Sequence, residues 1–250
     1  MKISDELAID FYLKADSLSP YSYHTTMKAL SFIERIPRAR KIADIGCGTG
    51  IQTVALYEGT QTRIAAIDFI PEFIETLQSE LKYQKLNEYI YPVFSSPYNL
   101  PFEYGELDIL WSERTASEIG FQYAVEEWSK YLKPEGYMAV CAYCWLTKNK
   151  PEEILDYMNE INPDIISIAE RIDQMQQAGF LPVAHFIMPD ECWWNYFCPL
   201  EENFDSFLKK HKNNADALQL VRKIDKEIDL YEKYSEHYGY VFFIGKKVCN

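Results

Sequence analysis

The fold of this chain is decided by one stretch, Lys41-Ile-Ala-Asp-Ile-Gly-Cys-Gly-Thr-Gly50. Its residues Ile42, Ala43 and Ile45 form a short apolar run that is typical of a buried parallel strand. Three glycines follow at alternate positions, and residues 51–57 read as the start of a helix. Glycines let the backbone approach a ligand closely, and the first turn of a helix offers free N–H donors. Strand, glycine turn and helix together predict a nucleotide-binding site.

The residues around these glycines distinguish one nucleotide from another. A dinucleotide fingerprint requires Gly-x-Gly-x-x-Gly, whose third glycine would fall at Ile51, whereas this chain has its third glycine at Gly50. Asp44 lies two residues before Gly46, and we expect its carboxylate to face the ligand. A carboxylate there suits a ligand with an ammonium or other positive charge better than a pyrophosphate. An incidental glycine turn is the alternative for so short a pattern.

A second acidic residue makes the pattern more specific. Residues 63–68 form another buried strand, which ends in Asp68. This residue lies close to the spacing of about twenty residues at which an acidic side chain binds two ribose hydroxyls. Pro71 begins an amphipathic helix directly afterwards. Two linked signals are much more specific than either alone.

The alternation of strands and helices predicts an α/β fold with a doubly wound, mostly parallel seven-stranded sheet. A turn is expected at Lys133–Gly136, before the fifth strand. Two helices, at 6–14 and 24–35, would form an N-terminal arm across the open end of the sheet. The further strands are expected at 89–94, 107–111, 137–143, 182–188 and 239–245.

We predict a single domain of residues 1–250. It comprises an N-terminal helical arm (1–40), a core that binds the nucleotide (41–188), a helical insertion (189–238) and the last strand (239–250). The insertion is too long for a plain loop, and we expect it to cover the active-site edge of the sheet.

Composition narrows the range of partners. The chain has 38 acidic and 25 basic side chains and a formal charge of −13, which would repel a polyanion such as RNA or DNA. A solvated helix face explains the compact basic run at 209–212 better than a binding patch does. We therefore expect no nucleic-acid partner. The 19 Tyr and 14 Phe residues suggest aromatic-lined cavities as well as a core.

The six cysteines are scattered, unlike a disulfide framework. Cys141 and Cys144 lack a second pair at zinc-finger spacing, so we interpret them as core thiols and expect no metal. The start of the chain has no signal-like apolar segment, and no window approaches eighteen apolar residues. We expect a soluble, cytoplasmic protein with no membrane partner. The sequence does not predict an oligomeric state.

Residues 44–50, Asp-x-Gly-x-Gly-x-Gly, resemble motif I of the class I S-adenosylmethionine-dependent methyltransferases. Two later stretches are also similar to that family, Leu-Pro-Phe at 100–102 and the turn Leu-Lys-Pro-Glu-Gly at 132–136. The chain looks closest to a bacterial subgroup of unassigned acceptor, in the small-molecule branch of the ubiquinone/menaquinone-biosynthesis type. The resemblance implies a Rossmann-like methyltransferase fold, S-adenosyl-L-methionine as cofactor and methyl transfer to a small-molecule acceptor by in-line displacement.

The resemblance also implies roles for individual residues. Asp44 and Gly46 would hold the methionine part of the cofactor, and Asp68 would bind its ribose. Ser96 stands where an Asp is usual, so the side-chain contact to the adenine differs here. An aromatic face tolerates a cation, so Trp111 would lie below the sulfonium. The full cofactor-binding set is Asp44, Gly46, Cys47, Gly48, Gly50, Asp68, Phe69, Ser96, Pro97 and Trp111.

The acceptor side is less clearly marked. Glu113 follows the fourth strand and is a candidate base or acceptor-binding charge, with a solvent-facing or helix-capping carboxylate as the alternative. His185 is a second catalytic candidate, with a structural histidine as the alternative. An aromatic wall for a planar or cationic acceptor, or simple core packing, is expected from Trp193, Trp194, Tyr196 and Phe197. Side chains of the N-terminal arm that could reach the ligand or acceptor are Tyr12, Tyr21, Tyr23 and His24.

Three other functions compete with a small-molecule methyltransferase. A nicotinamide-dependent oxidoreductase is disfavoured by Ile51. A nucleic-acid methyltransferase is disfavoured by the charge and by the stretch Trp111–Arg114, where an Asn/Asp-Pro-Pro-aromatic tetrad would be needed. A protein that binds S-adenosylmethionine without catalysis remains open, because Arg114 and Thr115 replace the small residues expected after the fourth strand.

Overall fold

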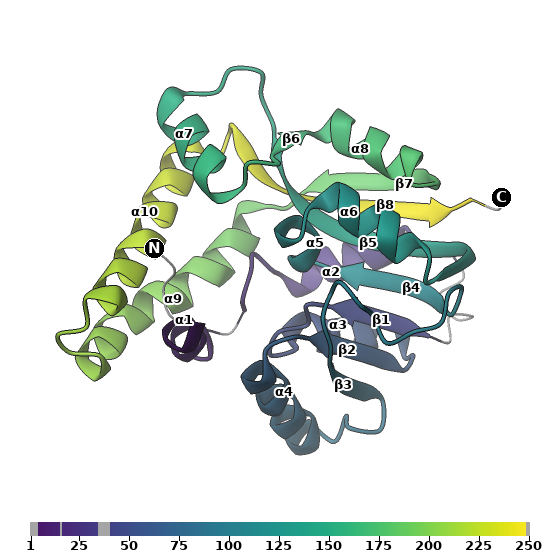
Figure 1. The fold of residues 1–250 in the computed structure, drawn as a ribbon, viewed down its shortest axis with the longest axis horizontal. Helices are drawn as coiled ribbons and strands as arrows, with labels where there is room; N and C mark the ends of the chain where they lie inside the picture. Colours follow the sequence, from purple (N-terminus) through teal and green to yellow (C-terminus); the bar gives the residue numbers. More distant parts are fainter. Residues whose placement is uncertain (1–4, 16, 35–40, 249–250) are drawn as a thin grey trace.

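The computed structural model describes residues 5–15, 17–34 and 41–248. Their strands form one sheet in the order β3-β2-β1-β4-β5-β8-β7, with the short β6 paired to β5 off this path (Figure 1). The seven strands of the main path correspond to the seven predicted strands. The strands are β1 Ile42–Ile45, β2 Ile64–Asp68, β3 Ile90–Phe94, β4 Leu107–Ser112, β5 Leu132–Trp145, β6 Ile166–Ser167, β7 Phe180–Ile187 and β8 Tyr238–Lys247.

Strand directions confirm the predicted doubly wound, mostly parallel sheet. Strands β1 to β5 run parallel to one another, and β8 is antiparallel to both of its neighbours, β5 and β7. The strand order reverses on either side of β1, which lies between β2 and β4. Ligands of open α/β sheets bind at such a switch point, outside the carboxyl ends of the strands.

The predicted turn at Lys133–Gly136 is instead part of strand β5. Leu132 already pairs with Leu107 of β4, and the next pair joins Tyr137 to Ile109. The intervening residues loop out as an irregularity without ending the strand. A Cβ atom on Gly136 would lie 2.9 Å from the carbonyl oxygen of Lys133, so the bulge is tight at this glycine.

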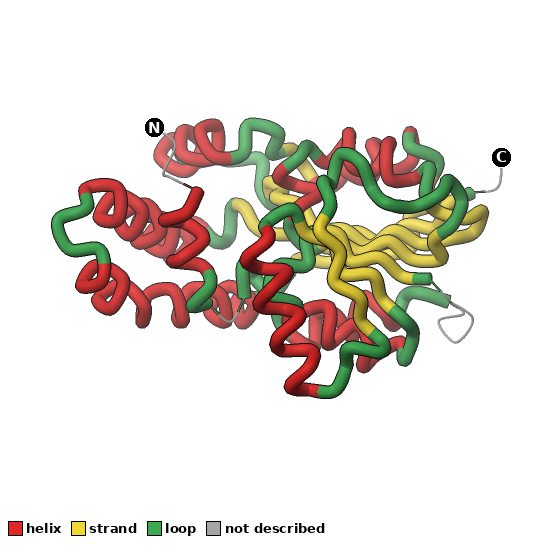
Figure 2. The backbone as a smooth tube through the Cα atoms, turned by 60° about the horizontal axis from the view of Figure 1, so that its bottom comes forward, coloured by secondary structure: helices red, strands yellow, loops and turns green. Residues whose placement is uncertain are grey.

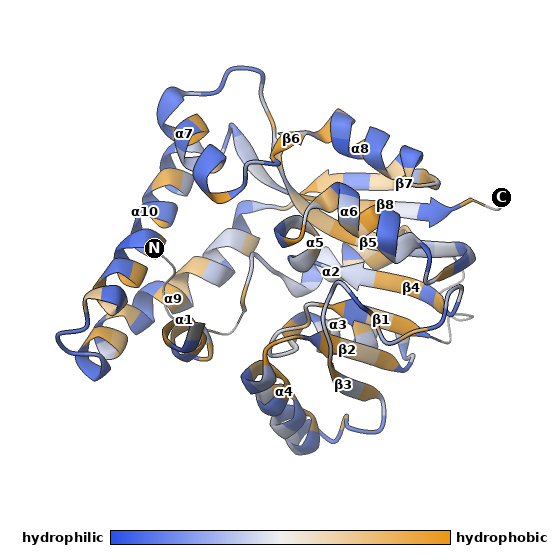
Figure 3. Cartoon of the chain, in the orientation of Figure 1, coloured by the Kyte–Doolittle hydropathy of each residue, from blue (hydrophilic) through white to orange (hydrophobic). Residues whose placement is uncertain are grey.

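Helices cover both faces of the sheet. One face, which carries Ile42 and Ile64, packs against α2 and α3. The opposite face, which carries Ala43 and Ile45, packs against α6 and α8. Figure 3 shows apolar strands between helices whose outer surfaces are hydrophilic. The helices are α1 Asp5–Tyr12, α2 Tyr23–Ser31, α3 Ile51–Thr60, α4 Pro71–Gln84, α5 Thr115–Glu118, α6 Phe121–Ser129, α7 Glu152–Ile161, α8 Ile168–Gln177, α9 Asp190–Lys210 and α10 Ala215–Tyr234.

Two long helices, α9 and α10, come between β7 and β8 along the chain. In space they extend beyond the end of the sheet, beside α1 (Figures 1 and 2). Their buried side chains belong to the same apolar cluster as one face of the sheet. This shared core ties the two helices to the rest of the fold.

The N-terminal arm differs slightly from its prediction. The expected helix at 24–35 is α2, which ends at Ser31, and residue 35 lies outside the described ranges. The side chain of Ser22 accepts a hydrogen bond from the backbone N–H of Thr25, which caps the start of α2. None of the helices in the described ranges combines the length and the apolar character needed to cross a bilayer.

Candidate active site

The glycine turn after β1 is hydrogen-bonded to the neighbouring strand β2. The backbone N–H groups of Gly46 and Cys47 both donate to the carbonyl of Ile67 in β2, at 2.7 and 2.9 Å. Gly46 has a φ of 77°, a left-handed conformation that glycine adopts at little cost. A Cβ atom built there would overlap the hydroxyl of Thr115, at the start of α5. Both the backbone angle and the packing therefore require glycine at position 46.

Asp68, at the end of β2, holds the same turn through hydrogen bonds. Its carboxylate accepts hydrogen bonds from the backbone N–H groups of Gly48 and Ile70, each at 2.9 Å. Burial raises the pKa of Asp68, although these backbone N–H groups oppose the shift. A carboxylate offers about four acceptor positions, so two such bonds leave capacity for hydroxyls of a ligand.

A cavity of about 470 Å³, called here the glycine-loop cavity, opens at this edge of the sheet. Four of the predicted cofactor residues line it, namely Gly46, Gly48, Asp68 and Phe69. The arm contributes Leu18 and Ser19, so it lies over this edge as expected. Further lining residues that the sequence did not single out as ligand contacts are Gln52, Ile70, Pro71 and Phe73.

Asp44 is placed differently from its prediction. Its carboxylate is fully buried beneath the turn and does not line the cavity. One oxygen accepts a hydrogen bond from the Thr53 hydroxyl at 2.6 Å, and the other has no partner among the described residues. Burial raises the pKa of Asp44 to about 7, and the nearby charge of Asp68 adds to this shift. Asp44 thus supports the start of α3 from within the core.

Cys47 and Gly50 also lie outside the glycine-loop cavity. The side chain of Cys47 is buried in an apolar cluster with Ile74 and Leu81 of α4. Gly50 begins α3, where a Cβ atom would overlap the side chain of Leu77. Both residues shape the turn and contact no part of the cavity.

Ser96 and Pro97, expected beside the adenine, do not line the cavity either. Ser96 is exposed, and its hydroxyl accepts a hydrogen bond from the backbone N–H of Tyr98 at 3.2 Å. Pro97 is buried, and its carbonyl accepts a hydrogen bond from the Trp128 indole at 2.9 Å, which fastens the loop to α6. The apolar border of the cavity is formed by the residues after β2 instead.

Trp111 and Glu113 are buried and hydrogen-bonded to each other. Trp111 is fully buried, packs edge-to-face on Phe242 and does not line the glycine-loop cavity, and its position below the ligand stays a prediction. Its indole N–H donates to Glu113 at 2.9 Å, and the Thr26 hydroxyl donates to the same oxygen at 3.2 Å. The second oxygen of Glu113 has no partner in the part of the chain that the structure describes.

The environment of Glu113 disfavours its charged form. The side chain is only 2% exposed. Burial raises the pKa of Glu113 to about 8, and the charge of Asp44 adds to this shift, while the hydrogen bonds from Trp111 and Thr26 oppose it. Glu113 is therefore not the exposed carboxylate of the alternative interpretation, but it does not line the cavity from which a base would act.

His185 does not line the glycine-loop cavity. It lies on β7, the last strand of the sheet and three places from β4. Exposure alternates along this strand, and His185 falls on an exposed position opposite Phe243 of β8. Its catalytic role stays a prediction, with a structural histidine as the alternative.

A second cavity of about 530 Å³, called here the tyrosine cavity, adjoins the first. The lining residues that the two cavities share are Ala8, Tyr12, Leu18, Ser19, Arg114 and Glu118. The tyrosines that line it are Tyr12, Tyr143, Tyr157, Tyr196 and Tyr240. The expectation of aromatic-lined cavities is therefore met by residues spread over the whole chain.

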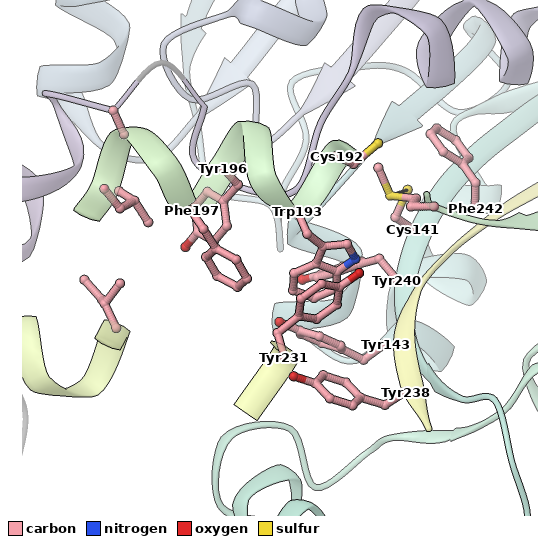
Figure 4. Close-up of a cluster of buried hydrophobic side chains, with 14 of the residues drawn as sticks. Cys141, Tyr143, Cys192, Trp193, Tyr196, Phe197, Tyr231, Tyr238, Tyr240 and Phe242 are labelled. Atoms are coloured by element: carbon pink, nitrogen blue, oxygen red, sulfur yellow. Dashed lines mark hydrogen bonds between the residues drawn. The ribbon is translucent and has the colours of Figure 1, made fainter. Parts of the chain in front are cut away.

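Only Tyr196 of the predicted aromatic wall lines this cavity. Trp193 is buried and stacks on Tyr231 of α10 with ring centroids 4.2 Å apart, as Figure 4 shows. Phe197 is buried in the same cluster, and Trp194 is 37% exposed. Core packing, the alternative interpretation, thus describes Trp193 and Phe197.

Arg114 stands where the two cavities meet. Its Nε donates to Glu118 at 2.6 Å, and its guanidinium also donates to the carbonyl of Leu18 in the arm. Burial opposes the charge of Arg114, but the pKa is nevertheless raised, chiefly by Glu118. The sequence marked Arg114 only as an unusual residue, because its partner Leu18 is far away along the chain.

The other candidate residues of the arm lie elsewhere. Tyr12 lines both cavities, whereas Tyr21 is buried and Tyr23 and His24 are exposed. The backbone N–H of Tyr21 donates to the carbonyl of Cys192 at 3.1 Å, which holds the arm against α9.

The cysteines and potential metal ligands form no additional centre in the described ranges. The free thiols there are Cys47, Cys141, Cys144, Cys192 and Cys198, and Cys249 lies outside them. No group of three or more His, Cys, Asp or Glu side chains in these ranges is arranged to hold a metal ion.

Comparison with known proteins agrees with this geometry. Residues 43–140 match the family described as Methyltransferase domain. No curated protein matches the sequence. YjhP from E. coli is a similar solved structure, with a TM-score of 0.81 and 15% identity over 98% of this chain and 100% of that one.

Two further solved structures extend this likeness. An S-adenosylmethionine-dependent methyltransferase from Geobacter sulfurreducens, in complex with S-adenosyl-L-homocysteine, has a TM-score of 0.80 and 13% identity over 96% and 97% of the two chains. Geranyl diphosphate C-methyltransferase from Streptomyces coelicolor has a TM-score of 0.64 and 14% identity over 90% and 80%. At these identities the likeness shows a shared Rossmann-like methyltransferase fold.

Proposed function

We propose that the chain is a class I S-adenosylmethionine-dependent methyltransferase with S-adenosylmethionine as its cofactor, and that it methylates a small-molecule acceptor held in the tyrosine cavity. One observation carries this proposal. The glycine-loop cavity and the tyrosine cavity adjoin at Tyr12, Arg114 and Glu118. A cofactor in one cavity and an acceptor in the other would therefore meet without crossing the protein core.

The residues of the glycine-loop cavity fit the cofactor. Its volume of about 470 Å³ lies within the range of about 300–1,000 Å³ that is usual for small-ligand sites. Asp68 retains acceptor positions for the two ribose hydroxyls, and Phe69 with Ile70 offers apolar surface for the adenine. Gly46 and Gly48 allow the methionine part to approach the backbone. When bound, the cofactor supplies a methyl group that is already activated on a sulfonium.

The protein then contributes orientation and the exclusion of water. The arm covers the edge of the sheet through Leu18 and Ser19, and Arg114 ties the arm to the start of α5. Correct positioning of two reactants supplies a large part of the rate enhancement in such a transfer. Asp44, Trp111 and Glu113 act as positioning residues in this proposal, because they support the turn and β4 from inside.

The finer assignments rest on the sequence. We propose that the chain belongs to the bacterial, ubiquinone/menaquinone-biosynthesis-type branch, on the basis of the stretches at residues 43–50, 111–113, 127–132 and 239–245. We further propose a cytoplasmic protein that binds no nucleic acid, on the basis of its scattered free thiols and its formal charge of −13. A single domain remains our prediction.

Cofactor binding without catalysis is the second candidate function. The hydroxyl of Thr115 packs directly over Gly46, where the methionine part would lie. Incubation with cofactor labelled on its methyl group and a metabolite extract separates the two functions. Transfer of label to a small molecule supports the enzyme, and binding with no transfer supports the alternative.

Calorimetric titration with S-adenosyl-L-homocysteine tests the placement of the cofactor. We expect Asp68→Ala to weaken binding about tenfold to a hundredfold, because it removes a charged hydrogen-bond acceptor. The matched control is Glu75→Gln, an exposed acid on α4, which should bind like the wild type. Circular dichroism checks that both variants are folded. Equal affinity of Asp68→Ala and wild type would contradict the placement.

A further inference from the structure

The tyrosine cavity is assembled from five different elements. Tyr12 comes from α1, Tyr143 from β5, Tyr157 from α7, Tyr196 from α9 and Tyr240 from β8. Tyr143 and Tyr240 are paired across β5 and β8, with ring centroids 4.1 Å apart. Figure 4 shows Tyr143, Tyr196 and Tyr240 among other buried aromatic side chains. Except for Tyr12, all are less than a tenth exposed.

The carboxylate of Glu227, on α10, lies among these rings. It accepts a hydrogen bond from the Tyr143 hydroxyl at 3.4 Å. Burial is the main cause of the raised pKa of each of the five tyrosines, and the charge of Glu227 raises every one of them further. One carboxylate is therefore within electrostatic reach of the whole group.

The cations that line the cavity leave Glu227 without a close ion pair. Arg114 is engaged by Glu118 and by the carbonyl of Leu18. Lys223 is exposed on the surface of α10. Burial raises the pKa of Glu227, and the charges of Arg114 and Lys223 oppose this shift. An acid in this position has unused capacity to attract a cation.

The hydroxyl of Tyr157 is a second, independent indication of a ligand. Tyr157 is 5% exposed, lines the cavity, and its hydroxyl has no hydrogen-bond partner among the described residues. Buried polar groups in folded proteins nearly always have a partner. A polar group of a ligand in this cavity would supply it.

We propose that the tyrosine cavity binds an amine acceptor, with its nitrogen held against the aromatic rings and the Glu227 carboxylate. Rings of Tyr attract a cation through their negative faces, and several rings around one carboxylate suit an ammonium group. A carboxylate or phosphate acceptor would instead face the Glu227 carboxylate, while Arg114 is engaged by Glu118 and Lys223 is exposed on the surface of α10. The proposal rests on the proposed function, since it names the acceptor class for that site.

The group-transfer step follows from this placement. The bound ammonium gives one proton to the Glu227 carboxylate, which leaves the nitrogen with a lone pair. That lone pair forms the new N–C bond to the methyl carbon, while the C–S bond breaks and its electrons stay on sulfur. The products are the N-methylated ammonium, S-adenosyl-L-homocysteine and the proton on Glu227, which passes to solvent. Glu227 is the general base of this step.

A binding experiment tests the acceptor class without relying on turnover. The probes are choline and its neutral carbon isostere, dimethylbutanol, titrated calorimetrically into the full chain with and without S-adenosyl-L-homocysteine. We expect choline to bind at least about tenfold more tightly than dimethylbutanol, because only choline carries the charge. Equal binding of the two probes, or a preference for dimethylbutanol, overturns the proposal.

Two variants in α10 and one in α7 test which residues bind choline. Glu227→Gln keeps the shape of the side chain and should remove the preference for choline. Glu232→Gln changes an exposed acid of the same helix that lines neither cavity, and it should keep the preference. Tyr157→Leu removes one ring and should weaken choline binding about threefold to tenfold. A preference for choline that survives in Glu227→Gln overturns the assigned site.

The same titrations separate this proposal from the proposed function. Binding of S-adenosyl-L-homocysteine without a preference for choline contradicts the amine acceptor and leaves the methyltransferase intact. Absence of S-adenosyl-L-homocysteine binding contradicts the placement of the cofactor, whatever choline does. Turnover with labelled cofactor and a panel of primary, secondary and tertiary amines completes the test. Label transferred to matched alcohols or phenols but to no amine also overturns the proposal.

Discussion

Gly46 combines a left-handed backbone with a neighbour that leaves no space for a side chain. Its φ is 77°, and a Cβ atom would overlap the Thr115 hydroxyl. We expect Gly46→Ala to lower the free energy of unfolding by about 2 kcal/mol or more, since backbone strain alone costs about 1–2 kcal/mol and the overlap adds to it. Urea denaturation measures the difference.

Gly105 offers a matched control for that experiment. Its φ of 71° is similar, and nothing lies within 4 Å of a Cβ atom built there. Gly105→Ala should therefore show the cost of backbone strain by itself, about 1 kcal/mol. If the two substitutions cost the same, Thr115 does not constrain the turn.

The raised pKa of Glu113 leads us to predict how the free energy of unfolding depends on pH. Its pKa rises from 4.5 in the unfolded chain to about 8 in the folded protein. The folded state therefore binds the proton of Glu113 more tightly than the unfolded chain does. This proton's contribution to the free energy of unfolding is complete below about pH 4.5 and is lost as the pH rises through about 8. Glu113→Gln cannot ionise and lacks this loss.

Denaturation at several pH values checks the sign. Between pH 5 and pH 9 the free energy of unfolding of Glu113→Gln should rise relative to wild type by more than about 2 kcal/mol, given about 1.4 kcal/mol for each unit of pKa shift. Glu75→Gln changes an exposed carboxylate, and its curve should run parallel to wild type. Parallel curves for Glu113→Gln as well would mean that Glu113 is not held neutral.

At the scale of elements, the N-terminal arm is attached to α9 by polar contacts. Asp10 of α1 pairs with Lys210 and His211 at 2.5 and 2.7 Å, and the side chain of Asn203 donates to the carbonyl of Phe11 at 3.3 Å. Residues of α1 line both cavities. These contacts at the far end of α9 therefore influence how firmly the active-site edge is covered.

We expect Asp10→Asn to loosen α1 with little effect on global stability. Partly exposed ion pairs contribute at most about 1 kcal/mol, so the midpoint of urea denaturation should scarcely change. Amide hydrogens of α1 should exchange faster, and S-adenosyl-L-homocysteine should dissociate a few times faster. Asp205→Asn, an exposed acid on α9, is the control and should leave both rates unchanged. Unchanged exchange in Asp10→Asn would show that these pairs do not hold the arm.

At the scale of the whole molecule, one apolar cluster joins the sheet to α9 and α10. It runs from Ile42 and Trp111 in the sheet to Trp193 and Tyr231 in the two helices. Elements that share a core unfold together, since neither part can keep its apolar surface buried alone.

We therefore predict a single unfolding transition that includes the insertion. Native-state hydrogen exchange should give the same opening free energy for slowly exchanging amides of α9, α10 and β5. Saturation with S-adenosyl-L-homocysteine should raise all of them together, by about 2.7 kcal/mol at a hundredfold excess over Kd. Separate values for the helices and the sheet would indicate two units.

The parts of the fold that the sequence predicted well depend on short-range patterns. Apolar runs such as 42–45 indicate strands because a buried parallel strand has both faces covered. The turn at Lys133–Gly136 was misplaced because turn-forming residues also occur in bulges, and only the pairing of Leu132 with Leu107 distinguishes the two. Helix α5 was missed because four residues carry no periodic signal.

The candidate site also combines features that depend on short-range patterns with features that depend on the packing of distant segments. Gly46, Gly48 and Asp68 line the glycine-loop cavity, and local sequence signals single them out because a ligand-binding turn needs fixed local geometry. Strand alternation sets the face on which Trp111 lies but not what covers that face, which is the core around Phe242. The position of His185 depends on the strand order, which puts its strand β7 at the edge of the sheet.

By itself the sequence determined the class of fold, the glycine turn and the acid that ends β2, because each depends on residues close together along the chain. Only the tertiary structure decided the lining of the tyrosine cavity, which draws on elements from α1 to β8. It also decided that Arg114 reaches Leu18 and that Asp44 and Glu113 are buried. These outcomes depend on how distant segments pack, and the local pattern of a segment carries no information about the partner that will cover it.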